Sequence, residues 1–109
     1  MTSAERGMQI WVVLCGCARN RQTLTYKGLA QLIGMGAGTL ARPLGHVMKY
    51  CDSNKLPALT SLVVKTGGGK PGVGLTTVEQ GTMDAERERV FNHNWYDGLP
   101  PTVADLKNT

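Results

Sequence analysis

The first apolar positions of the chain repeat at helical spacing. They occupy one face of a helix that is predicted over residues 4–19, and they follow the i, i+3, i+4, i+7 pattern. Ser3 is the expected N-cap, with Arg6 at the position where a capping box prefers Glu. Because several residues of this run are β-branched, a strand is the alternative. The apolar positions are Met8, Trp11, Val12 and Cys15.

Two further helices are predicted, each from its end signals. Thr25 as N-cap and Gly34 as the residue after the C-cap delimit a helix over residues 26–33. Thr39 can cap a third helix that ends at Asn54 and tolerates Pro43 in its first turn. This pair fits a helix-turn-helix, as it fits many helical hairpins that never touch DNA. The inward positions of the third helix are Leu40, Leu44, Val47, Met48 and Cys51.

The second half of the chain predicts a hairpin followed by helix. Residues 59–65 are rich in β-branched side chains and predict a strand, and the Gly-rich residues 66–72 lead to a possible return strand over 73–78. Residues 83–93 predict a helix, and a last helical turn follows Thr102. We therefore predict an α+β, mainly α, fold: a winged helix-turn-helix with a small β-hairpin, in a single domain over residues 1–109.

Charge divides the chain into a basic front and an acidic back. Residues up to Gly72 include nine Lys and Arg and two Asp and Glu, a net charge of +7. Residues from Val73 onward include three Lys and Arg and six Asp and Glu, a net charge of −3. A basic front predicts an anionic partner. Its basic side chains either form one phosphate-contacting face or are scattered over the surface. They are Arg19, Arg21, Lys27, Arg42, Lys49, Lys65 and Lys70.

The number of cysteines and the hydropathy of the chain indicate the cellular compartment in which the protein is expected. An odd number of cysteines, three, argues against a disulfide framework and for a reducing compartment. No run approaches the roughly 18 apolar residues of a membrane span, and the chain start lacks signal-peptide features. We expect a cytoplasmic protein without a membrane partner. The Cys and His residues lack paired ligand spacing, so neither a metal nor a cofactor is expected.

Short motifs between residues 24 and 90 resemble a known family. The chain is similar to the C-terminal DNA-binding domain of alkylguanine-DNA alkyltransferases and of their non-enzymatic alkyltransferase-like relatives. In that family V-x-Y-G-x-[IL]-A opens the first helix of the motif, R-A-V-G-x-A-[ML] lies on the recognition helix, P-C-H-R-V-V follows N-P, and a wing ends in G-G-L. The matching segments here are Leu24–Ala30, Ile33–Gly34, Ala41–Met48, Asn54, Pro57, Leu62–Val64, Gly72–Leu75 and Glu86–Arg87.

The family's reactive residues are replaced in this chain. Thr60 stands where the family has its alkyl-accepting Cys, and Ser61 stands at its activating His. A hydroxyl without an adjacent base is a poor nucleophile, so we expect no alkyl transfer and no enzyme activity. The alkyltransferase-like relatives usually carry a large aromatic residue at the Cys position, and Thr60 does not supply one.

Two positions that the family uses on DNA are retained. The resemblance implies that Tyr26 rotates the phosphate of a flipped nucleotide and that Arg42 fills the gap left in the base stack. The alternatives are a half-buried Tyr26 ring closing the start of its helix, and an Arg42 that is solvated or paired with an acid.

We expect non-enzymatic binding of DNA by a winged helix domain. The candidate nucleic-acid-binding residues are Tyr26, Arg42, His46, Lys49, Lys65 and Lys70. The alternative for His46 is an exposed helix residue. The alternative function is a protein-interaction or small-ligand module that keeps only the fold, with a possible homodimer through residues 8–17. The chain is also similar to short bacterial proteins of mobile gene cassettes, a resemblance that implies no activity.

Overall fold

The computed structural model describes residues 1–65 and 83–108 of the chain. Within these ranges the protein is mainly helical, with one short two-stranded sheet, so the predicted α+β, mainly α, class is confirmed. In chain order the elements, with η marking a 3-10 helix, are α1 (Ser3–Arg19), β1 (Leu24–Thr25), α2 (Tyr26–Ile33), η1 (Ala37–Thr39), α3 (Ala41–Ser53), η2 (Leu59–Leu62), β2 (Val63–Val64), α4 (Met83–Asn92) and α5 (Val103–Lys107).

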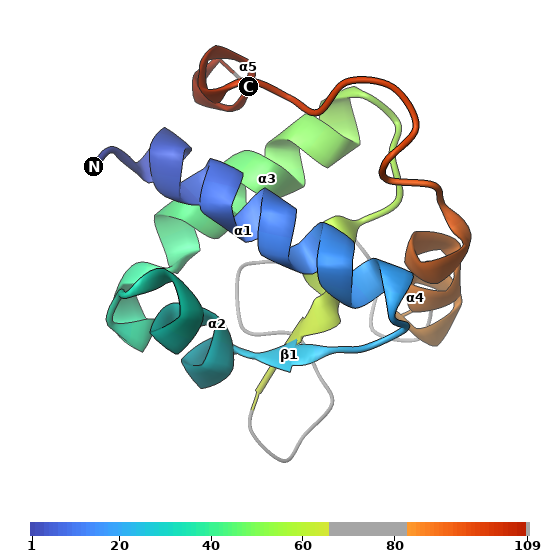
Figure 1. The fold of residues 1–109 in the computed structure, drawn as a ribbon, viewed down its shortest axis with the longest axis horizontal. Coiled ribbons are helices and arrows are strands. Elements are labelled where there is room, and N and C mark those ends of the chain that lie inside the picture. Colours follow the sequence, from blue (N-terminus) through green and yellow to red (C-terminus); the bar gives the residue numbers. More distant parts are fainter. Residues whose placement is uncertain (66–82, 109) are drawn as a thin grey trace.

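Helix α1 is the central element, as Figure 1 shows: α3 lies behind it, α5 beside its first turns and α4 beside its last turn. The predicted helix is confirmed, but its apolar stripe is rotated, because Val12 is 64% exposed. The stripe consists of Ala4, Gly7, Ile10, Trp11, Leu14, Cys15 and Ala18. Most residues of the Met8–Cys17 segment are thus buried or half-buried in the fold. Val12 is the one large hydrophobic residue of this segment that is exposed.

The N-cap of α1 is Thr2, so the prediction of Ser3 is wrong by one residue. The Glu5 N–H donates to Thr2 Oγ1 at 3.1 Å, and the Thr2 N–H donates to Glu5 Oε1 at 2.8 Å. This reciprocal pair is a capping box. The register follows from the chemistry, because a cap at Thr2 places Glu5 at N3, whereas a cap at Ser3 would place Arg6 there.

Helix α2 ends where its turn residues predict, whereas α3 begins differently. Thr25 caps α2 through a bond from the Gly28 N–H, and Gly34 ends it at φ 72°. Thr39, the predicted cap of α3, lies in η1 and donates to the Gly36 carbonyl instead. Helix α3 packs mainly on α1, and α2 meets α1 and η1. The two helices are joined through residues 34–40, and α3 is held chiefly by α1, whereas α2 is held by α1, η1 and the two strands together.

The predicted strand over residues 59–65 is largely wrong. Leu59 and Leu62 are both fully buried, and a 3-10 helix brings residues three apart to the same side. Only β2 is extended, and it pairs in parallel with β1 in the register Leu24↔Val63 and Thr25↔Val64. The predicted wing over 66–72 and return strand over 73–78 lie outside the described residues.

The C-terminal elements agree with their predicted positions. Helix α4 spans nearly all of residues 83–93, and α5 follows Thr102, whose capping box uses Asp105. Between them, the Trp95 ring stands edge-on to Trp11 at a centroid distance of 5.5 Å. Trp95 thereby ties the α4–α5 connection to α1. None of the helices in the described ranges has the length and continuous apolar character of a bilayer crossing.

Two glycines offer a matched test of this backbone. Gly34 has a positive φ, whereas Gly45 lies inside α3, and a Cβ at either would meet nothing within 4 Å. We expect Gly34→Ala to lower the free energy of unfolding by about 1 kcal/mol, and Gly45→Ala to raise it by about 0.5–1 kcal/mol. Urea unfolding monitored by circular dichroism measures both. Equal effects of the same sign would contradict these helix boundaries.

Candidate functional site

The solvent-facing side of α3 carries two cations with a glycine between them. The helix buries Pro43, Leu44, Val47 and Cys51, and at 100° per residue the opposite side presents Arg42, Gly45 and Lys49. We call these three residues the α3 face. Arg42 and Lys49 are both exposed, two helical turns or about 10 Å apart along the axis.

The charges of the α3 face are not neutralised within the described part of the chain. Neither Arg42 nor Lys49 forms an ion pair with a described residue. Arg42 lies in the first turn of α3, where the helix dipole is positive and disfavours a cation unless an anion is close. The α3 face therefore favours a bound anion at its N-terminal end. A Cβ built on Gly45 would point into open space, so the surface between the cations is flat enough for close approach.

The parallel sheet gathers a second group of predicted residues. Thr25 pairs with Val64, so Tyr26 and Lys65, which follow them, leave the sheet at the same end. Lys65 is exposed, and Tyr26 is half-buried with its ring packed on the core. Lys27 is also exposed in the first turn of α2. This sheet end thus places two lysines beside the start of α2.

His46 has a structural position instead of an open one. Its Nδ1–H donates to the Leu106 carbonyl at 2.9 Å, and its Nε2 lies 3.1 Å from Ser3 Oγ. A carbonyl only accepts, so Nδ1 carries the proton, and Nε2 of the neutral ring accepts from the hydroxyl. His46 is half-buried, so the alternative of an exposed helix residue is wrong. Both ring nitrogens are used to join α1, α3 and α5.

The remaining basic residues in the described ranges differ in their surroundings. Arg21 is held by both carboxylate oxygens of Glu88, at 2.7 and 2.9 Å, and lies over the Phe91 ring at 4.9 Å. Its charge is therefore compensated. Arg19 lies at a pocket at the C-terminal end of α1. Lys70 lies outside the described residues.

The two residues at the family's reactive positions are enclosed. Thr60 and Ser61 are 2% and 4% exposed. Ser61 Oγ has no hydrogen-bond partner among residues 1–65 and 83–108, so no described histidine is placed to accept its proton. Arg87 Nε donates to the Ser61 carbonyl at 2.9 Å, and Glu86 accepts from the Ala58 N–H at 2.6 Å. These contacts fasten α4 to η2.

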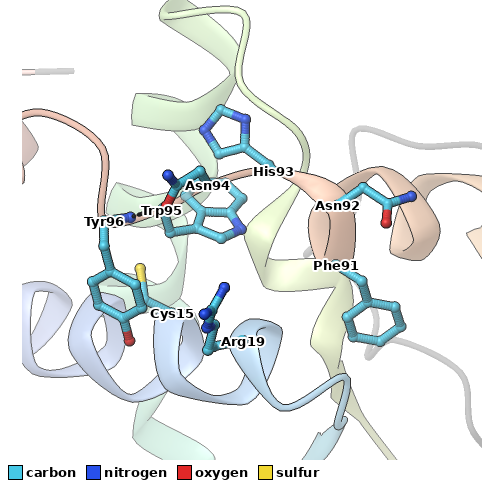
Figure 2. Close-up of a pocket in the computed structure, with 8 residues that line it drawn as sticks. All are labelled: Cys15, Arg19, Phe91, Asn92, His93, Asn94, Trp95 and Tyr96. Atoms are coloured by element: carbon cyan, nitrogen blue, oxygen red, sulfur yellow. Dashed lines mark hydrogen bonds between the residues drawn. The ribbon is translucent and has the colours of Figure 1, made fainter.

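A pocket of about 200 Å³ lies between α1 and the C-terminal end of α4 together with the residues that follow it, as Figure 2 shows. Two residues of α1, Cys15 and Arg19, face the residues 91–96 across it. Burial raises the pKa of the Cys15 thiol to about 12, so this thiol is not a nucleophile at neutral pH. Linear spacing does not predict this pocket, because its two walls come from segments about seventy residues apart.

Comparison with known proteins adds no family. Neither the protein-family models nor the curated proteins nor the solved structures contain a match to this chain.

Within residues 1–65 and 83–108, no three His, Cys, Asp or Glu side chains gather as a metal-binding group.

The structural position of His46 has a measurable consequence. We expect His46→Ala to lower the free energy of unfolding by about 1–3 kcal/mol, because it removes the hydrogen bonds that His46 makes to the Leu106 carbonyl and to the Ser3 hydroxyl. Lys49→Ala, three residues further along the exposed side of α3, should change it by less than about 0.5 kcal/mol. Urea unfolding compares the two. A His46→Ala variant as stable as Lys49→Ala would show that these hydrogen bonds do not join the helices.

Proposed function

We propose that this chain is a non-enzymatic DNA-binding domain that places the α3 face against a duplex. The observation that carries the proposal is the pair of exposed cations, Arg42 and Lys49, which form no ion pair with a described residue and share one side of a helix whose other side is buried. A single exposed helix fits the major groove of B-form DNA, which is about 12 Å wide. The N-terminal turn of such a helix makes the base contacts in helix-turn-helix proteins.

The two cations of the α3 face would have different tasks. Arg42, in the first turn, has the planar guanidinium that reads guanine or phosphate in a bidentate manner. It is also the residue that the alkyltransferase resemblance assigns to the base stack. Lys49, two turns further, would contact a phosphate as a point charge. Gly45 between them would allow the helix backbone to approach the groove.

The sheet end would supply further contacts to the DNA backbone. Lys65 and Lys27 are exposed there, beside the start of α2. Phosphate contacts of this kind fix orientation on the duplex and carry no sequence information. Tyr26 would act at the same place, as the resemblance implies for a phosphate-contacting tyrosine. Lys70 and the predicted wing are included in the proposal on the basis of the sequence alone, because both lie outside the described residues.

The burial of Thr60 and Ser61 supports a function without catalysis. A nucleophile must reach its substrate and pass its proton to a base. Both residues are enclosed, and the Ser61 hydroxyl has no hydrogen-bond partner in the part of the chain that the structure describes. His46, the histidine of α3, has both ring nitrogens engaged with Ser3 and Leu106. We therefore propose recognition of DNA without alkyl transfer.

A salt titration of duplex binding tests this proposal. Fluorescence anisotropy with a short labelled duplex should show an affinity that falls steeply with salt, because counterions are released from phosphates. Arg42→Ala should weaken binding by about 1–3 kcal/mol, and Lys49→Ala should reduce the salt slope by about one unit. Lys107→Ala on α5 is the matched control for loss of one exposed cation.

Two results would reject the proposal. One is the absence of binding to the duplex at low salt by the wild-type chain. The other is an equal effect of Lys107→Ala and Arg42→Ala, because binding would then follow net charge and not the α3 face.

A further inference from the structure

The pocket between α1 and residues 91–96 has rigid walls. The Trp95 indole N–H donates to the Val90 carbonyl at 2.8 Å, and the Trp95 ring stands edge-on to Trp11 and to His93. Asn94 Oδ1 accepts from the Tyr96 N–H at 3.2 Å. These bonds fix the loop that forms one wall, and a helix forms the other. A ligand would therefore meet a largely preformed site, which lowers the entropy cost of binding.

The charge of the residues that line this pocket favours binding of an anion. None of its lining residues is acidic. Arg19 is exposed and forms no ion pair with a described residue, whereas Arg21, two positions on, is fully engaged with Glu88. Figure 2 shows the Arg19 side chain rising from α1 toward Trp95 and the loop. Asn92 and His93 also line the pocket, but Figure 2 shows their side chains directed away from Arg19, so Arg19 is the group that would hold the anion.

Aromatic side chains form part of the other walls, although most of the accessible lining surface is polar. Tyr96 is 62% exposed, and Figure 2 shows its ring beside Cys15 and near Arg19. The Phe91 ring and the edge of Trp95 complete the lining. Aromatic faces of this kind hold a planar ring by offset or edge-on contact. A volume of about 200 Å³ is smaller than the roughly 300–1,000 Å³ of drug-sized sites, so the ligand is small.

We propose that this pocket binds a small molecule that carries one aromatic ring and one anionic group, a carboxylate or a phosphate. Arg19 holds the anionic group, and the ring lies against Tyr96 and the edge of Trp95. This proposal rests on the pocket alone. It is independent of DNA binding by the α3 face, since none of the residues of that face lines the pocket.

Titration of the folded protein with five simple probes tests the assignment. Benzoate and phenyl phosphate carry both features, benzamide keeps only the ring, and acetate and inorganic phosphate keep only the charge. The readout is the NMR signal of the Trp95 indole N–H together with the Tyr96 ring. We expect saturable shifts with benzoate or phenyl phosphate, and affinity at least about tenfold weaker for the three partial probes. Benzoate and phenyl phosphate together tell whether a carboxylate, a phosphate or either is accepted.

Arg19→Gln and Lys107→Gln form a matched pair of variants. Each removes one exposed cation, but only Arg19 lines the pocket. Arg19→Gln should weaken the preferred probe by about tenfold or more, and Lys107→Gln by less than about twofold. Urea unfolding confirms that both variants fold. The proposal is overturned if no probe shifts Trp95 at tens of millimolar, if benzamide binds as well as benzoate, or if both variants bind alike.

Discussion

The packing of α1 on α3 is the interaction on which the rest of the structure depends. Ile10 and Leu14 from α1 and Leu44 and Val47 from α3 are all fully buried, and burial of each such side chain contributes about 1.5–3 kcal/mol. Gly7 permits the close approach, because a Cβ there would lie 3.2 Å from Leu106 Cδ1 and 3.4 Å from the Pro43 carbonyl. Once this interface forms, the opposite side of α3 must face solvent.

Both proposed surfaces follow from the position of α1. Its N-terminal half holds α3 and α5, partly through the hydrogen bonds of His46, and so presents Arg42 and Lys49 outward. Its C-terminal half forms one wall of the pocket and meets the α4–α5 connection through Trp11 and Trp95. One helix thus supports a cationic face and a separate aromatic pocket. Neither surface needs residues of the other, so the two proposals stand or fall separately.

Local signals in the sequence predict much of this fold, and long-range contacts account for most of what they miss. Thr25 and Gly34 predict the ends of α2 because capping and a positive φ are decided within a few residues. The segment around Thr60 looks like a strand from its β-branched residues, yet the burial of Leu59 and Leu62 on one side favours a 3-10 helix. Parallel pairing with β1 is equally invisible in local spacing.

In the candidate site, too, some features follow from local sequence signals and others depend on long-range contacts. Helical periodicity suffices to place Arg42 and Lys49 on one exposed side of α3. The half-buried state of His46 depends on Ser3 and Leu106, which are 43 and 60 residues away in sequence. The compensation of Arg21 by Glu88 likewise spans 67 residues. Number and spacing of charges can be taken from a sequence, but which charges remain unpaired is a property of the folded chain.

Mapping of the duplex contact by two-dimensional ¹H–¹⁵N NMR tests the central claim most directly. At low salt, addition of a short DNA duplex is expected to shift the amide signals of Arg42, Gly45 and Lys49 most, with smaller shifts at Lys27 and Lys65. Signals of residues 91–96 should stay in place. Shifts confined to the pocket, or spread evenly over all exposed lysines and arginines, would contradict the assignment of the α3 face.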